Sequence, residues 1–255
     1  MADGLRISSQ NPRYFSFDGK PFFFTGATPT WTPISDSDCD FSAENKALIE
    51  HGGNFTRILV YFPAAGLLPW NSVNAQIAPN GGPVFDLDSF NGDFWKRLAA
   101  FCEDCAQKNI IIWLEIFDEP SIRYDKGPHA RYAAHPFNPD NNINLTTDDG
   151  LPAGAYQPTC RQLYDAVRVP GMKRVLGSQQ RYVEKVLETT APYANRIVYS
   201  ICNEYTYNEG SPDAADKSHA FAFPKYWADF IHDWARNNNS DLLVAMMPGR
   251  SPDTN

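Results

Sequence analysis

The segment 197–202 is a largely apolar run of strand length, and Asn203 and Glu204 follow it directly. A strand that is buried on both faces has such a continuous apolar run, which is typical of parallel sheets in α/β proteins. In these folds the chemistry takes place just beyond the carboxyl ends of the strands. We therefore expect Glu204 to be held rigidly and partly out of water, as a catalytic acid would be. The ordinary alternative is a solvated glutamate at the start of a loop.

The rest of the chain alternates between apolar strand-length runs and amphipathic segments. Strands are predicted at residues 22–27, 55–62, 110–117, 197–202 and 242–247, and helices at 44–51, about 90–108, 179–190 and 226–236. A β-hairpin with an Asp18-Gly19 turn is predicted over residues 5–20, capping the N-terminal end of the fold, and a loop is predicted up to about Pro83. This alternation favours a (β/α) fold with parallel strands. A Gly-x-Gly-x-x-Gly after the first strand and a Gly-Lys-Ser/Thr motif are both missing, so a barrel fits better than a nucleotide-binding fold.

Composition excludes several classes of function. The 255 residues carry a formal net charge of −8 and no long basic run, so nucleic acid is not an expected partner. The sequence has no run of 18 apolar residues, so no membrane span is predicted, and the N-terminus lacks an apolar secretory segment. We expect a cytoplasmic protein, or a secreted one whose signal has been removed. Cys102 and Cys105 form a Cys-x-x-Cys inside a helical pattern with no second ligand pair, so neither a metal nor a cofactor is expected.

Four segments together resemble the clan A glycoside hydrolases, the (β/α)8 retaining enzymes that include the cellulase and mannanase family. The segments are residues 11–31, whose opening looks like that of the apiosidase-like members, residues 53–58, residues 85–95 and the pair Asn203-Glu204. The similarity extends from about residue 8 to residue 250. It implies a TIM-barrel fold and hydrolysis of O-glycosidic bonds in an oligosaccharide, polysaccharide or glycoside by a retaining, two-carboxylate mechanism.

The roles known in this clan carry over where the residues match. Glu204 would be the general acid/base, Asn203 would hydrogen-bond the 2-hydroxyl group of the sugar, and Arg57 would support the nucleophile. Each of these residues could instead have a purely structural role; for Arg57 this would be a structural salt bridge. Polar and aromatic residues at the predicted strand ends suit a neutral, polyhydroxylated ligand, and we expect substrate contacts from Trp31, Tyr61, Asp118, Glu119 and Tyr205.

One feature departs from the clan pattern. Retaining glycosidases need a second carboxylate about 5–5.5 Å from the first, and in this clan it follows the seventh strand. The sequence predicts about five strands, because a long insertion at residues 118–178 uses much of the length. We therefore expect residues 1–255 to form a single barrel domain that is incomplete at its C-terminus and carries the acid/base half of the site.

Two other functions remain open. The chain could be a non-catalytic carbohydrate-binding protein derived from the same fold. It could also be a metal-dependent hydrolase that uses Asp118 and Glu119 with His129 or His135. The metal-dependent alternative ranks last, because no His-x-Asp or His-x-His pair stands at a strand end.

Overall fold

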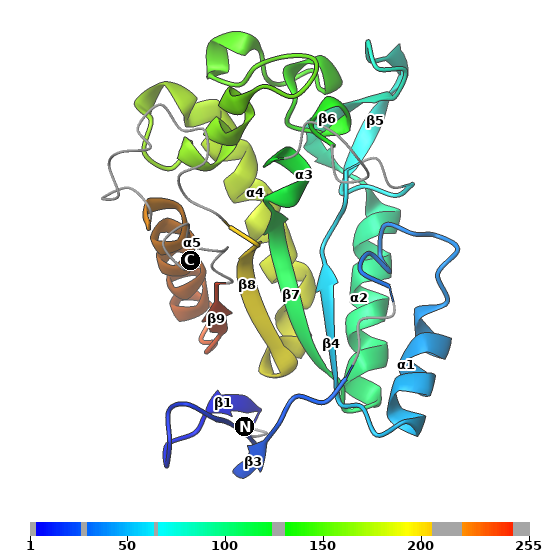
Figure 1. Ribbon diagram of the computed structural model, residues 1–255, viewed down its shortest axis with the longest axis vertical. Helices are drawn as coiled ribbons and strands as arrows, with labels where there is room; N and C mark the ends of the chain where they lie inside the picture. The colour runs from blue at the N-terminus through cyan, green and yellow to red at the C-terminus, as the bar shows by residue number, and fades with distance from the viewer. Residues whose placement is uncertain (1–3, 27–29, 64–65, 124–130, 206–220, 247–255) are drawn as a thin grey trace, which may run out of the picture.

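The centre of the molecule is a parallel sheet, seen in a computed structural model that describes residues 4–26, 30–63, 66–123, 131–205 and 221–246. Its strands lie in the order β4 (Phe55–Leu59), β7 (Ile111–Asp118), β8 (Ile197–Asn203) and β9 (Leu243–Ala245) (Figure 1). The four parallel strands predicted from residue 55 onward are confirmed. Within the described ranges the sheet is open, so closure into a barrel stays a prediction.

Amphipathic helices cover the sheet. They are α1 (Phe41–Glu50), α2 (Gly92–Gln107), α4 (Lys173–Thr190) and α5 (Ala222–Asn237), so all four predicted helices are confirmed, with α4 starting six residues early. In α2, the Asn91 side chain caps the first turn by accepting from the Asp93 amide at 3.1 Å. The apolar face of α2, including Phe94 and Leu98, is fully buried against the core. None of the helices in these described ranges is long and apolar enough to cross a membrane.

The N-terminal segment differs from the prediction. We expected residues 22–27 to form the first strand of the parallel sheet. Instead, β1 (Leu5–Ile7), β2 (Phe15–Phe17) and β3 (Lys20–Phe22) make a separate antiparallel sheet. The Asp18-Gly19 turn, with φ of 49° and 75°, reverses the chain so that residues 20–22 pair back onto β2. In the described part of the predicted strand, residues 22–26, Gly26 pairs with the parallel sheet through one isolated bridge to Phe55.

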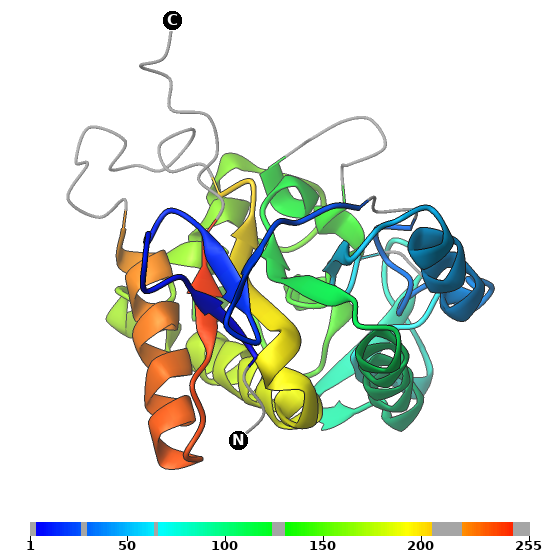
Figure 2. The same cartoon turned by 90° about the horizontal axis from the view of Figure 1, so that it is seen from below.

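The antiparallel sheet packs against the beginning of the parallel strands. Leu5 forms a small buried cluster with Ile111 and Val198, which lie near the amino ends of β7 and β8. Figure 2, a view from below, shows the sheet lying across these strand ends. The opposite, carboxyl edge of the parallel sheet is therefore the edge that can carry a site.

The segment before α2 was predicted as a loop, and this is wrong. Residues there form two antiparallel strands, β5 (Trp70–Ile77) and β6 (Pro83–Phe90), with irregular register. Most side chains of β5 are exposed, so the strand has no apolar alternation that a sequence pattern could reveal.

Residues 120–123 and 131–172 lie above the carboxyl end of β7 (Figure 1) and contain mostly short helical turns. These turns are α3 (Pro120–Arg123), η1 (Tyr132–Ala134), η2 (Pro139–Asn141), η3 (Thr147–Asp149), η4 (Pro158–Asp165) and η5 (Pro170–Met172), and a further turn, η6 (Ala191–Arg196), follows α4. Asparagine side chains stabilise the turns: Asn138 accepts from the Asp140 amide at 3.1 Å, and Asn142 accepts from the Leu145 amide at 2.7 Å. The segment therefore has the Asn/Asp turn chemistry that its composition indicates.

Candidate active site

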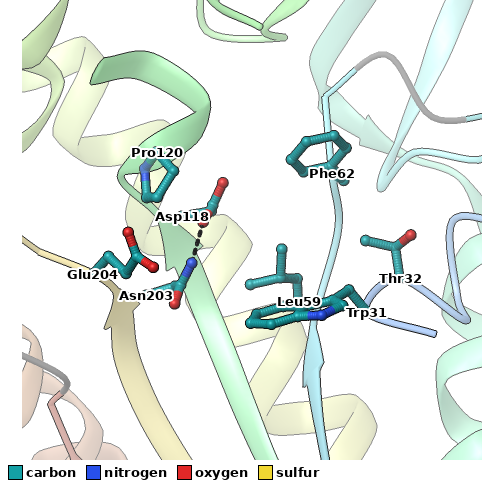
Figure 3. Close-up of a pocket in the computed structure, with 8 residues that line it drawn as sticks. All are labelled: Trp31, Thr32, Leu59, Phe62, Asp118, Pro120, Asn203 and Glu204. Atoms are coloured by element: carbon teal, nitrogen blue, oxygen red, sulfur yellow. Dashed lines mark hydrogen bonds between the residues drawn. The ribbon is translucent and has the colours of Figure 1, made fainter. Parts of the chain in front are cut away.

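A pocket of about 350 Å³ opens at the carboxyl edge of the parallel sheet (Figure 3). Its lining comprises Trp31, Thr32, Leu59, Phe62, Asp118, Pro120, Asn203 and Glu204. Asp118 and Asn203 are the last residues of β7 and β8 and are partners in the register of these neighbouring strands. Sheet geometry alone therefore brings together two site residues that are 85 positions apart.

A chain of hydrogen bonds runs along the floor of the pocket. The Asn203 amide nitrogen donates to Asp118 Oδ1 at 2.7 Å, and Asn203 Oδ1 accepts from an Arg57 guanidinium nitrogen. Arg57 Nε in turn donates to Glu115 Oε1 at 2.8 Å, and Trp113 Nε1 donates to the same oxygen at 3.0 Å. Strands β4, β7 and β8 thus contribute one continuous polar network.

Glu115 is the buried anchor of this network. Its side chain is fully buried, and desolvation raises the pKa of the carboxyl group, while Ser200, Arg57 and Trp113 lower it. A carboxylate in such a place is costly unless a cation lies beside it. Arg57 is therefore held between Glu115 and Asn203, and its position is set by the sheet rather than by solvent.

Glu204 lies at the pocket but is not shielded as we expected. Its side chain is exposed, and its backbone has φ of 49°, a left-handed conformation that is uncommon for residues other than glycine. The left-handed turn directs the chain out of β8 at this residue. The expectation of a partly buried carboxyl group is wrong for this structure, because the strand ends at Asn203 and the next residue already faces solvent.

Asp118 is half-buried at the end of β7. Desolvation, together with the charges of Glu204 and Glu115, raises the pKa of this carboxyl group from 3.8 to about 6, against hydrogen bonds from Asn203 and the Ser121 amide that lower it. Asp118 and Glu204 therefore interact electrostatically. Figure 3 shows both carboxyl groups on the same side of the pocket, with Asn203 beside them.

The other side of the pocket is aromatic and apolar. Trp31, Thr32, Leu59 and Phe62 lie there (Figure 3). Trp31 is 44% exposed, and the Arg57 guanidinium lies 4.8 Å from the centroid of its ring. An exposed indole held by a cation in this way presents a flat apolar face to a ligand.

Three further residues predicted to contact substrate do not line this pocket. Tyr61 is buried among Trp70 and Tyr182, with its hydroxyl 3.4 Å from His135 Nε2. Glu119 is fully buried in an ion pair with Arg161 of η4.

Tyr205 packs on Tyr164 and Phe223 in the core. Of the eight residues assigned from the sequence, Trp31, Asp118, Asn203 and Glu204 line the pocket, and Arg57 reaches it through Asn203.

Two contributors were missed at the sequence level. Phe62 lines the pocket although its neighbour Tyr61 was chosen, because the chain leaves β4 after Leu59 and the alternation of faces no longer holds. Glu115 was not assigned to the site, yet a charged residue inside the apolar run 111–117 was a visible signal of a buried ion pair. In the described ranges there is no group of three or more metal-ligating side chains. His129 lies outside those ranges.

Several solved glycoside hydrolases superpose on this chain. A glycoside hydrolase family 5 mannosidase from Rhizomucor miehei superposes with a TM-score of 0.60 at 15% identity, over 100% of this chain and 57% of the mannosidase. An endo-1,4-β-mannanase from Rhizomucor miehei superposes with a TM-score of 0.56 at 17% identity, over 92% of this chain and 58% of the mannanase. The resemblance to clan A glycoside hydrolases is thus confirmed at the level of fold, and the chain spans less than two thirds of either enzyme.

No curated protein matches the chain. A family model does match, over residues 67–251, which include strands β5 to β9, the pocket residues Asp118, Asn203 and Glu204, and all of α2, α4 and α5. The chain belongs to this family, which is described as a domain of unknown function (DUF6298).

Proposed function

We propose that the pocket is part of a glycoside hydrolase site in which Glu204 is the general acid/base. The observation that carries the proposal is the placement of Asn203 and Glu204 at the end of β8, in one pocket with Trp31, with Asn203 hydrogen-bonded to Arg57. An exposed carboxyl group at a rigid strand end can reach the oxygen of a leaving group. The sugar would lie between Glu204 and the aromatic side of the pocket.

The neighbours of Glu204 have complementary tasks in this proposal. Asn203 donates to the 2-hydroxyl group of the sugar, a contact that strengthens as the transition state becomes oxocarbenium-like. Arg57 fixes Asn203 and the indole of Trp31, which stacks on a sugar ring. The network thus binds and orients the substrate, while Glu204 moves the proton.

The mechanism requires a second carboxylate. In a retaining reaction this group attacks the anomeric carbon from the face opposite the leaving group, about 5–5.5 Å from the acid/base. Among the described residues that line the pocket, the carboxylates are Asp118 and Glu204, and both lie on one side (Figure 3). We therefore propose that the described residues supply the acid/base half of the site, and that a protein without a second carboxylate in this pocket would bind sugar without turning it over.

A non-catalytic carbohydrate-binding protein is the alternative, and the same one-sided placement of carboxylates favours it. The two functions differ in one measurable property. A hydrolase releases reducing ends from its glycoside substrate, whereas a binding protein retains affinity for sugars and releases none.

The test is a glycosidase assay of the full-length protein with manno-oligosaccharides and aryl mannosides. A mannosidase of the same fold has been solved in complex with mannosyl-fructose, which makes mannosides the first class to try. Glu204→Gln keeps the size of the side chain and removes the transferable proton, so turnover of oligosaccharides should fall by about 10²–10⁴-fold. Activated aryl mannosides, which need little protonation, should be less affected in the first step.

Glu184→Gln is the matched control, because Glu184 is exposed on α4 away from the pocket. Asn203→Ala should lower kcat more than it raises KM, since its hydrogen bond to the sugar strengthens in the transition state. Unchanged oligosaccharide turnover in Glu204→Gln would overturn the assignment. Sugar binding without turnover would favour the alternative, a non-catalytic carbohydrate-binding protein.

A further inference from the structure

The Asn203 side chain lies between a cation and a carboxyl group. Its oxygen accepts from Arg57, and its nitrogen donates to Asp118 Oδ1 at 2.7 Å. The residue is only 5% exposed and yet lines the pocket. A primary amide has nearly the same shape in its two flipped orientations, so its partners decide which end a ligand meets.

We propose that Asp118 is a positioning residue that, together with Arg57, locks the Asn203 amide in the single orientation needed to donate to a sugar hydroxyl group. This inference rests on the proposed function, because Asn203 is the residue placed against the sugar. It assigns Asp118 to the support of Asn203 rather than to a substrate contact.

The two partners admit only one orientation. A guanidinium has donors and no acceptor, so only the amide oxygen can face Arg57. An ionised carboxylate has acceptors and no donor, so only the amide nitrogen can face Asp118. A flipped Asn203 would set NH₂ against the guanidinium and oxygen against the carboxylate, which replaces two hydrogen bonds by two repulsive contacts.

Asp118 is itself held in place. Its Oδ2 accepts from the Ser121 backbone amide at 3.0 Å, and the Ser121 hydroxyl donates to the Asp118 carbonyl at 2.7 Å. These bonds tie the end of β7 to the start of α3 (Pro120–Arg123). Each carboxylate oxygen therefore has one fixed donor, and rotation of the side chain would break both bonds.

The lock leaves one hydrogen for a ligand. The amide nitrogen of Asn203 carries two hydrogens, and Asp118 accepts one of them. The other hydrogen is left for a ligand, because Asn203 lines the pocket. A hydroxyl group of a bound sugar is the class of acceptor that this geometry suits.

The lock responds to pH. Burial, together with the charges of Glu204 and Glu115, raises the pKa of Asp118 to about 6. Arg57 lies on the other side of Asn203. The other titratable groups that interact electrostatically with Asp118 or its neighbours are Tyr61, Tyr164, Cys202 and Glu119. Above about pH 6 Asp118 is a pure acceptor and the lock is closed. Below that pH the protonated carboxyl group can also donate, and the preference for one amide orientation weakens.

The direct test is the NMR signal of the Asn203 side-chain NH₂ group in the 255-residue chain, assigned by its loss in Asn203→Ser. We expect this signal to titrate with a midpoint near pH 6. In Asp118→Asn the titration should disappear, because the isosteric amide has no proton that titrates in this pH range. In Glu204→Gln the titration should persist with a lower midpoint, because a neighbouring negative charge has been removed.

The control variant is Asp93→Asn, which changes an exposed carboxylate on α2 and should leave the titration as it is. An Asn203 signal that does not move between pH 4 and 8 in the parent protein would overturn the proposal. An unchanged titration in Asp118→Asn would overturn it as well. The parent titration decides the matter even if Asp118→Asn does not fold.

A second measurement connects the lock to sugar binding. We expect Asp118→Asn to weaken the binding of mannotriose by about tenfold, the usual effect of losing a charge-assisted hydrogen bond. Asn203→Ala should weaken it similarly, and the double variant should bind no worse than Asn203→Ala. Fully additive losses would overturn the positioning role.

If mannotriose and related sugars do not bind at all, the proposed function fails. The NMR titration still judges the lock in that case.

Discussion

A buried histidine should make this fold sensitive to acid. His135 lies in the core among Tyr61, Tyr132 and Phe137, and its Nδ1 accepts from the Phe137 amide at 3.2 Å. Nδ1 is an acceptor, so the neutral ring carries its proton on Nε2, which faces the Tyr61 hydroxyl. Burial lowers the pKa of His135 from 6.5 to about 3, because no water solvates a charged ring there.

The sign and size of the effect follow from this pKa. The unfolded chain binds a proton at His135 below about pH 6.5, whereas the folded chain does so only below about pH 3. The contribution of the neutral, buried His135 to the free energy of unfolding is therefore fully present above pH 6.5 and is lost as the pH falls toward 3. At about 1.4 kcal/mol for each pH unit, the loss reaches about 2 kcal/mol near pH 5 and about 3 kcal/mol near pH 4.

Urea unfolding at pH 8 and pH 5 measures the loss. His135→Asn keeps an acceptor in the position of Nδ1 for the Phe137 amide and removes the titrating group. The variant will be less stable than the parent at pH 8, because the smaller side chain leaves space in the core. Between pH 8 and pH 5, however, its stability should fall by about 2 kcal/mol less than that of the parent.

Comparing the stability change between pH 8 and pH 5 in the parent and in His135→Asn cancels the contributions of the other titrating groups, which both proteins share. His232→Asn, at an exposed position on α5, provides the matched control for replacing a histidine by asparagine. Equal stability losses in the parent and in His135→Asn between pH 8 and pH 5 would refute the reasoning. They would mean that the core admits water or a counter-charge on acidification.

Three further predictions test the fold and the site. Leu114→Ala removes a fully buried side chain from the second strand of the sheet, so the free energy of unfolding in urea should fall by about 2–5 kcal/mol. Gly26→Ala should destabilise the protein by more than about 1 kcal/mol, because a Cβ atom there would lie 2.0 Å from the Phe55 carbonyl oxygen. The control is Gly92→Ala at the start of α2, where a Cβ atom meets nothing within 4 Å and should cost no stability. Equal effects of the two changes on the free energy of unfolding would contradict this account. Trp31→Ala should weaken mannotriose binding by about two- to tenfold, measured by calorimetry, since the exposed indole is the stacking face; undiminished affinity would remove Trp31 from the site.

The parallel strands and the helices were predictable because their signals are local. Each apolar run from residue 55 onward is bounded by turn residues, and each helix has an apolar stripe such as that of α2. The antiparallel strands β5 and β6 escaped prediction because most side chains of β5 face water, which leaves no pattern to detect. Residues 22–27 have the composition of a buried strand, but the turn at Asp18-Gly19 assigns residues 20–22 to a different sheet.

The pair Asn203-Glu204 and its place at a strand end were determined by the sequence alone, since an apolar run followed by an amide and a carboxylate is a local pattern. What the tertiary structure decided is how these residues are surrounded. It left Asp118 half-buried and Glu204 exposed, it turned Tyr61 into the core and Phe62 into the pocket, and it joined Arg57, Glu115 and Asn203 in one network. The reason is physical: burial, hydrogen-bond partners and pKa values depend on strands that are neighbours in the sheet but far apart in the chain.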